Sequence, residues 1–188
     1  MTALYDRIWI TSKTRMISER RYLSYDLAAH LMINTLSAVM LLASIYPQEI
    51  GSIIPGFSKI NVACSILLFA ISLIVYGFKF GEKAARHREC YLKLQDLIEH
   101  EMPHHQMAEK YSAIMECYPN HASRDYFDLI FERCNVQNNP ICSPGTENKI
   151  IPSKSIVCIY FLRRAAFLGF CYALPIGTLA ISILSLVG

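Results

Sequence analysis

Residues Ile60 to Phe78 have the sequence INVACSILLFAISLIVYGF, nineteen residues without Asp, Glu, Lys or Arg. About 20 apolar residues in a helix cross the hydrocarbon layer of a membrane, and a helix satisfies its own backbone hydrogen bonds there. Cations follow at once, at Lys79, Lys83, Arg86 and Arg88, and such cations favour the cytoplasmic side. The stretch therefore predicts a transmembrane helix. A buried core helix of a soluble domain is a weaker alternative, because two more such stretches occur in the chain.

The composition of the chain also favours a membrane protein. Hydrophobic residues make up 53% of the 188 residues and charged residues only 18%, against roughly 25% charged in soluble domains. A chain of this length cannot bury so much apolar surface in a core of its own. The net charge of +3 argues against a protein that coats nucleic acid. The seven cysteines are odd in number and lack a Cys-x-x-Cys spacing, which indicates free thiols and not a disulfide framework.

Leu27 to Tyr46 is the predicted first span, and its polar residues fall on one stripe when residues are placed about 100° apart. The second span carries a matching stripe. Together these stripes, which we call the polar seams, contain Asp26, His30, Asn34, Ser37, Ser44, Asn61, Ser65 and Ser72. Polar groups inside a span are costly unless they face protein or water. Both seams should point into a helix bundle, where they either form interhelical hydrogen bonds or line a pore or hydrated cavity with Asp26 and His30 at its cytoplasmic mouth.

The distribution of cations predicts the topology. Five Lys and Arg residues precede the first span, one lies in the connection from Pro47 to Lys59, and twelve follow the second span up to Arg164. Because cations are retained in the cytoplasm, the two spans over residues 27–78 are predicted to form a transmembrane hairpin with its loop outside. Residues 1–26 are then a cytosolic basic helix, too long and too mixed in charge for a signal peptide.

Residues 79–135 are predicted to form a cytosolic helical domain. Apolar residues recur there at three- and four-residue spacing between charges, as in amphipathic helices. Pro103 divides the stretch into two arms that can fold into a hairpin. The apolar face includes Leu94, Leu97, Tyr111 and Met115. We expect this face to be core, and the alternative is that it binds a partner protein.

The C-terminal part of the chain predicts a linker and a third span. Residues 136–164 begin with a stretch rich in Asn, Pro, Ser and Gly, which is typical of a linker. Residues 165–188 carry no charged side chain and predict a C-terminal transmembrane helix. Small residues occur at every fourth position, at Ala165, Gly169, Ala173 and Gly177. Such ladders allow close helix packing in lipid, so they predict an interface with the hairpin of the same chain or with another subunit.

These features together predict an all-α membrane protein with three spans and one cytosolic helical domain. Metal binding is not favoured, because Pro103 interrupts the histidines at 100, 104 and 105 and no HExxH or Cys-x-x-Cys completes a coordination sphere. Signatures of hydrolases, P-loops and dinucleotide-binding turns are also missing from the sequence. We therefore expect no enzyme activity, no catalytic residues, no metal and no cofactor.

The stretch YPNHASRDY, from Tyr118 to Tyr126, predicts a hinge between two helices. Pro119 ends one helix, Ser123 can cap the next, and Asp125 lies in its first turn, where negative charge is favoured. A hydrolase or nuclease that uses His121 and Asp125 is the weakest alternative.

Three stretches carry a resemblance to a known family. They are WITSKTRMISERRY at Trp9–Tyr22, KAARHRECYLKLQDLI at Lys83–Ile98 and YSAIMECYPNHASRDY at Tyr111–Tyr126, the last two after a two-span hairpin. Over residues 5–135 the chain resembles the SLATT superfamily, the membrane effectors named for association with SMODS nucleotidyltransferases and SLOG nucleotide-binding proteins. The likeness to its family five, which includes members encoded with reverse transcriptases, rests on Tyr118, Asn120, His121, Asp125 and Tyr126.

The resemblance implies an effector of bacterial anti-phage defence in the inner membrane, a toxin that disrupts or permeabilises the membrane and so aborts infection. It implies restraint by a sensor complex, either a reverse transcriptase with its DNA and RNA (a retron) or a nucleotide-signalling protein. A homo-oligomer in contact with lipid is expected. Direct contact with nucleic acid is disfavoured, because the cytosolic cations are interleaved with acids. The alternative function is a non-conducting adaptor that tethers a sensor to the membrane. The family core has two spans, and the third predicted span departs from it.

Overall fold

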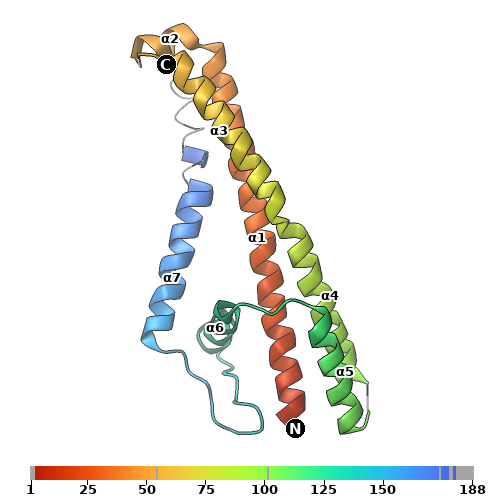
Figure 1. Cartoon of the computed structure of the whole chain (residues 1–188). Helices are drawn as coiled ribbons and strands as arrows, with labels where there is room; N and C mark the ends of the chain where they lie inside the picture. The colour runs from red at the N-terminus through yellow and green to blue at the C-terminus, as the bar shows by residue number, and fades with distance from the viewer. Residues whose placement is uncertain (1–2, 54, 101, 174, 178–179, 181–188) are drawn as a thin grey trace. The chain divides into compact units, whose positions relative to one another are not determined.

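The structure is a computed structural model that describes residues 3–53, 55–100, 102–173, 175–177 and 180 (Figure 1). Its helices are α1 (Ala3–Ile45), α2 (Pro47–Ile53), α3 (Phe57–Phe78), α4 (Phe80–Glu99), α5 (His104–Cys117), α6 (Ser123–Phe131), the π-helix η1 (Glu132–Val136), α7 (Lys154–Leu168) and the π-helix η2 (Gly169–Ala173). These residues contain no strand, although an isolated antiparallel bridge joins Cys142 to Lys149. The predicted all-α fold class is confirmed.

Three helical stretches are long and apolar enough to cross a membrane. They are Ala3–Ile45, Phe57–Glu99 (α3 with α4) and Lys154–Gly177. Residues 181–188, the end of the predicted third span, lie outside the described residues. Each predicted span therefore overlaps a helical stretch of suitable length and composition, the third one from Ala165 to Gly177.

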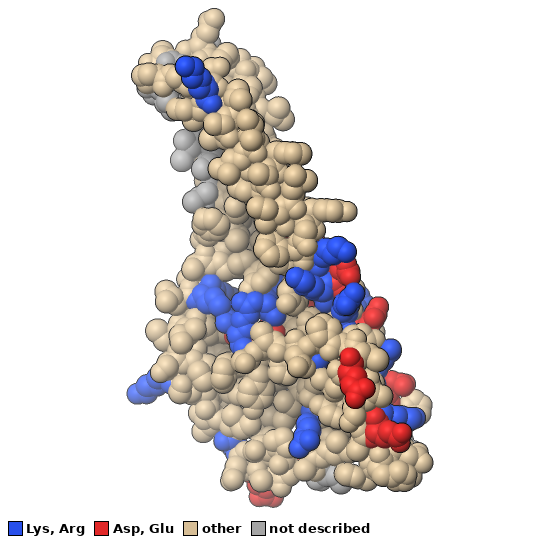
Figure 2. Space-filling view, viewed as in Figure 1, with Lys and Arg blue, Asp and Glu red and all other residues tan. Residues whose placement is uncertain are grey.

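The chain divides into two compact units. We call Met1–Ser24 with Phe80–Leu162 the charged unit, and Tyr25–Lys79 with Arg163–Gly188 the apolar unit. Figure 2 shows Lys, Arg, Asp and Glu side chains gathered on one part of the surface and nearly absent from another. α1 belongs to both units, because it continues without a break from Ala3 to Ile45.

The great length of α1 follows from its sequence. Ala3–Ile45 contains neither proline nor glycine, so no residue in it breaks the backbone hydrogen-bond ladder. The helix ends one residue before the Tyr46–Pro47 bond, since a residue that precedes proline disfavours the helical conformation.

α3 is bounded by two residues with left-handed backbone conformations. It begins after Gly56, whose φ of 77° suits a residue without a side chain. It ends at Lys79, whose φ is 50° and whose N–H donates to the Tyr76 carbonyl. α4 starts at the next residue, so a single left-handed lysine separates α3 from α4.

Two apolar clusters hold the first half of α1 in the charged unit. The Ile8 cluster consists of buried Ile8, Cys90, Leu94 and Leu97, with Leu4, Ile98, Met102, Met107, Tyr111, Ile114 and Tyr118 packed against it. The Ile17 cluster consists of buried Ile17, Leu129 and Ile141, with Trp9 and Ile10 packed against it. α1 is therefore enclosed by α4 and α5 at one cluster, and by α6 and the following loop at the other.

The apolar face of residues 94–115, expected to be core with partner binding as the alternative, is largely covered in the structure. Leu94 and Leu97 are 0% and 4% exposed and pack on Ile8, so they are core, and their assignment as a partner surface is wrong. Tyr111 is half-buried, and its hydroxyl is 3.1 Å from that of Thr11. Met115 is also half-buried. The N-terminal helix covers this face, which sequence periodicity could not show.

The predicted linker also differs from the structure. α7 begins at Lys154, inside the segment 136–164, because Ser153 serves as its N-cap and accepts a hydrogen bond from the Ile156 N–H at 3.4 Å. Residues 137–153, which we call the strap, pack on α1. Ile141 of the strap is 5% exposed in the Ile17 cluster, and the Gly145 N–H donates to Asp6 at 3.1 Å. The strap is thus part of the charged unit's core.

Candidate functional site

The polar seams are brought together at one point of the apolar unit. In Figure 1 the second half of α1 runs beside α3, and Asn61 Nδ2 of α3 donates to Ser44 Oγ of α1 at 2.7 Å. The Asn61 Oδ1 atom is buried and has no partner among the described residues. An interhelical hydrogen bond therefore exists in this hairpin, as one of the two predicted roles requires.

Three seam hydroxyls, those of Ser44, Ser65 and Ser72, donate hydrogen bonds within their own helices. Ser65 donates to the Asn61 carbonyl at 2.9 Å, Ser72 to Phe69 at 2.7 Å and Ser44 to Met40 at 2.8 Å. Such bonds to a carbonyl of the preceding turn lower the cost of placing a hydroxyl in an apolar medium. They do not require water or a second helix.

None of the eight seam residues is buried. His30, Asn34, Ser44 and Ser65 are exposed, and the other four are half-buried. At the start of the first seam, His30 Nε2 lies 3.9 Å from the Asp26 carboxylate. Thr35, which sequence analysis did not select, is instead 8% exposed and donates to the Leu31 carbonyl. One chain therefore leaves the seams partly uncovered.

The small-residue ladder is largely exposed in the described part of the last helical stretch. Ala165, Gly169 and Ala173 are exposed and Gly177 is half-buried, and a Cβ built on either glycine would meet nothing within 4 Å. The π-helix over Gly169–Ala173 also changes the helical phase, since its bonds run from residue i to i+5. An interface at this ladder, with the hairpin of the same chain or with another subunit, stays a prediction.

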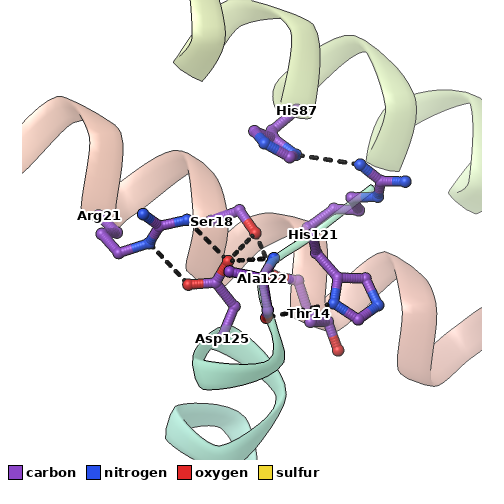
Figure 3. A network of polar contacts seen from close by, with 8 residues as sticks. Thr14, Ser18, Arg21, His87, His121, Ala122 and Asp125 are labelled. Atoms are coloured by element: carbon purple, nitrogen blue, oxygen red, sulfur yellow. Dashed lines mark hydrogen bonds and ion pairs between the residues drawn. The ribbon is translucent and has the colours of Figure 1, made fainter. Parts of the chain in front are cut away.

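The second candidate feature is a buried carboxylate in the charged unit (Figure 3). Asp125 is 0% exposed and accepts four hydrogen bonds. Two come from Arg21, Nε to Oδ1 at 2.7 Å and Nη2 to Oδ2 at 2.8 Å, one from Ser18 Oγ at 2.7 Å and one from the Ala122 N–H at 3.2 Å. Burial raises the pKa of Asp125, but the Arg21 and Ser18 hydrogen bonds and the Arg21 charge outweigh it and hold the pKa below its usual value. The carboxylate is thus ionised and fixes α6 to α1.

Arg15 and His87 lie beside this carboxylate. Arg15 is fully buried, its Nη1 lies 3.3 Å from His87 Nδ1, and it donates to the Pro119 carbonyl. Burial and then the Arg15 charge lower the pKa of His87 to about 4, so this imidazole is neutral at pH 7 and its Nδ1 accepts from Arg15. The ring of Tyr22 stacks on His87 with centroids 5.5 Å apart. We call Arg15, Ser18, Arg21, His87 and Asp125 the buried polar cluster.

The residues of the family-like motif have unequal roles in this arrangement. Asp125 is central to the buried polar cluster. His121 is half-buried with Nδ1 3.4 Å from the Ala122 carbonyl, and Asn120 is exposed. Tyr118 packs on the Ile8 cluster, and Tyr126 lies beside Phe127 with ring centroids 6.0 Å apart. Chemistry that joins His121 to Asp125 has no support here, because the carboxylate is occupied by Arg21, Ser18 and Ala122.

The hinge itself is present, with one difference. α5 ends at Cys117 and α6 begins at Ser123, as the sequence predicts. The N-cap residue is however Ala122, and no side chain of that residue caps the helix. The Asp125 carboxylate satisfies the Ala122 N–H instead, which is the reverse half of a capping box.

Sequence analysis missed Arg15, Ser18, Arg21 and His87 as members of the site. Arg15, Ser18 and Arg21 recur every third residue along α1 and so lie on one side of the helix. This spacing was the signal in the sequence that could have indicated a shared polar site. The bonds to Asp125 cross 104 and 107 residues of sequence. Across the described residues, no group of three His, Cys, Asp or Glu is arranged to hold a metal ion.

The model of the SMODS and SLOG-associating 2TM effector domain family 5 matches residues 1–187. The chain belongs to SLATT family 5. The match extends beyond residues 5–135, so the third apolar helix of this SLATT protein lies inside the family domain and is not an addition to it. No curated protein and no solved structure matches the chain. This SLATT protein is therefore a membrane effector by family, with a buried polar cluster and two uncovered polar seams as its distinctive features.

Proposed function

We propose that this SLATT protein permeabilises the bacterial inner membrane during anti-phage defence, as a homo-oligomer whose polar seams face one another across subunits. The observation that carries this proposal is the exposure of seam residues on helices that are apolar and long enough to cross a membrane. His30, Asn34 and Ser65 would face hydrocarbon in an isolated chain, and polar side chains there are unfavourable.

Assembly removes this penalty. In a bundle of several hairpins the seams face protein or water, while the apolar remainder of α3 contacts lipid. Large residues on α3 such as Ile66, Phe69 and Leu73 are 55–65% exposed, which suits a lipid-facing surface. A bundle lined by Asn, Ser and His side chains would let ions pass and so depolarise the cell.

Restraint by a sensor completes the proposal. An effector that permeabilises its own host's membrane must be silent before infection, and the family is named for association with SMODS and SLOG proteins. In this arrangement the charged unit lies in the cytoplasm with the N-terminus, and it contacts the sensor, which is a reverse transcriptase with its DNA and RNA or a nucleotide-signalling protein. Deletion of the partner gene should make expression of this chain toxic.

The seams are tested by expression of seam variants in bacteria with a dye that reports membrane potential. The wild-type chain expressed alone should depolarise cells, and the double variant Asn34→Leu with Ser37→Leu should not. Thr35→Val is the matched control, because it removes a hydroxyl from the same helix at a buried position off the seams. Full toxicity of the double variant, at equal amounts in the membrane, would exclude a lined pore.

A non-conducting adaptor is the second candidate. It is favoured by the seam hydroxyls that bond to their own helices and by the Asn61–Ser44 bond, because neither needs water in the bundle. An adaptor predicts copurification of a sensor with the chain and no change in membrane potential at any expression level.

A further inference from the structure

The part of α1 that lies inside the charged unit is unusually polar for a core helix. Ile8 and Ile17 are its buried apolar residues among those described there. Its buried polar residues are Thr11, Ser12, Thr14, Arg15 and Ser18, each 8% exposed or less. Apolar burial is the main stabilising contribution in a protein core, so this helix is held in place by specific polar contacts in addition to the Ile8 and Ile17 clusters.

Some of these polar groups would stay satisfied if α1 moved. Thr11 donates to the Arg7 carbonyl and Thr14 to the Ile10 carbonyl, both at 2.8 Å and both within α1. The contacts that fix its position are those to other elements. Buried contacts among them join Ser18 and Arg21 to Asp125 of α6 and Arg15 to His87 of α4. Nearer the surface they include Asp6 with Gly145 of the strap, Thr11 with Tyr111 of α5, and Arg20 with Glu132 of η1.

The position of α1 in this structure, which we call the seated position, also has unfavourable features. Ser12 Oγ and the Arg15 Nε and Nη2 atoms are buried without a hydrogen-bond partner among the described residues. Buried polar groups that lack a partner lose the hydrogen bonds that water would give them. Movement of α1 that hydrated these atoms would recover part of that loss, so the seated state depends on the contacts of Asp125.

α1 connects this region to the first span without interruption. The helix is continuous from Ala3 to Ile45, so a rotation or shift of its first half is carried along a stiff backbone to Asp26, His30 and Asn34. Coupling between distant sites requires an element with two discrete arrangements that both sites influence. The buried polar cluster and the two apolar clusters fix one arrangement of α1, and a second arrangement would be one in which the contacts of Asp125 are broken.

We propose that the contacts of Asp125 with Ser18 and Arg21 are a latch that holds α1 in the silent position, and that opening this latch is the step that activates the effector. The inference rests on the proposed permeabilising function. The partner that restrains the protein would then act by keeping α1 seated, and its loss would allow the helix to move.

Variants with opposite expected effects test the latch. Asp125→Asn removes the charge that Arg21 contacts. Ser18→Ala is a milder change, because it removes the hydroxyl contact with Asp125, and the other contact of that hydroxyl, with the Thr14 carbonyl at 3.2 Å, lies within α1. Ser12→Ala removes a buried hydroxyl that has no partner and should hold α1 more firmly. Glu132→Gln is the matched control, because Glu132 pairs with Arg20 of the same helix at 2.8 Å but at an exposed position.

Two measurements on the full chain decide the outcome. The first is amide hydrogen exchange of residues 3–24 in detergent micelles, and the second is the inducer concentration at which expressing cells depolarise. Asp125→Asn should speed the exchange by about tenfold or more and lower the depolarisation threshold, since removal of one partner of a buried ion pair favours local opening by at least that factor. Ser18→Ala should act in the same direction, Ser12→Ala in the opposite direction, and Glu132→Gln should change neither quantity.

The results separate this inference from the proposed function. If the wild type depolarises cells but Asp125→Asn and Ser18→Ala speed exchange without lowering the threshold, the latch is overturned and permeabilisation stands. If no variant and no wild-type chain depolarises cells at full expression, the proposed function fails. If Asp125→Asn does not accumulate in the membrane, the comparison of Ser18→Ala with Ser12→Ala tests the latch instead. Equal depolarisation thresholds for these two variants would refute the latch.

Discussion

Lowering the pH from 7 to 5 should destabilise the charged unit, because His87 takes up a proton when the unit unfolds. In the folded chain its imidazole is 3% exposed and has a pKa of about 4, lowered from 6.5 by burial and then by the Arg15 charge. The other groups that face it are Arg21, His121 and Asp125, and of these only the carboxylate raises the pKa. The unfolded state therefore binds more protons than the folded state between pH 6.5 and 4.

The sign and size of the effect follow from this difference. Above pH 6.5 His87 is mostly neutral in both the folded and the unfolded state, so its titration does not lower the free energy of unfolding. As the pH falls from 6.5 toward 4, the unfolded state takes up the proton first, and the free energy of unfolding decreases. A difference of 2.5 pKa units corresponds to at most about 3 kcal/mol in the free energy of unfolding, of which about 2 kcal/mol is lost by pH 5. Asp125, whose pKa lies below its usual value, adds a further loss only at still lower pH.

The single tryptophan of the chain provides the assay. Trp9 packs against the Ile17 cluster, with the Arg133 guanidinium 4.9 Å from its ring, so its fluorescence reports on the charged unit. Urea unfolding of the detergent-solubilised chain, followed by this fluorescence at pH 7, 6 and 5, gives the free energy of unfolding at each pH. The control is His87→Gln, whose amide oxygen can accept from Arg15 without titrating. An equal decline with pH in the wild type and in His87→Gln would refute the assignment of a neutral, buried His87.

Three further predictions concern packing and backbone conformation. Asp125→Ala should lower the free energy of unfolding by about 3–5 kcal/mol, because it leaves Arg21 beside an empty position in the core. Glu132→Ala should lower it by less than about 1 kcal/mol. Urea unfolding of both variants measures the difference, and equal losses would contradict the reasoning. Ile141→Ala should lower the free energy of unfolding by about 2–4 kcal/mol in the same assay, since this strap residue is 5% exposed. A decrease below about 0.5 kcal/mol would mean that the strap does not pack on α1 in solution. Lys79→Gly should be tolerated, whereas Lys79→Val should lower the free energy of unfolding by about 1 kcal/mol or more, because a φ of 50° suits glycine and disfavours a β-branched residue. Thermal unfolding in detergent compares the two variants. Equal melting temperatures would count against the left-handed conformation.

Local sequence determined the helical character of the chain and the position of its spans. Long uncharged stretches can satisfy their backbone only as helices in lipid, and Pro47 and Pro103 placed helix ends close to where the structure has them. The boundary of α7 was less well predicted. The Asn- and Pro-rich composition of the preceding loop concealed the capping role of Ser153.

The buried polar cluster was decided only by tertiary structure. Asp125 gave one local signal, its place in the first turn of a helix, and that signal is explained without a partner. Its ion pair with Arg21 spans 104 residues of sequence. Five cations precede the first span, and the packing of α1 between α4 and α6 decides which of them reaches the Asp125 carboxylate. The periodicity of Leu94 and Leu97 likewise showed an apolar face but not what covers it. Periodicity records the direction of a side chain relative to its own helix, and the partner in that direction is set by the fold of the whole unit.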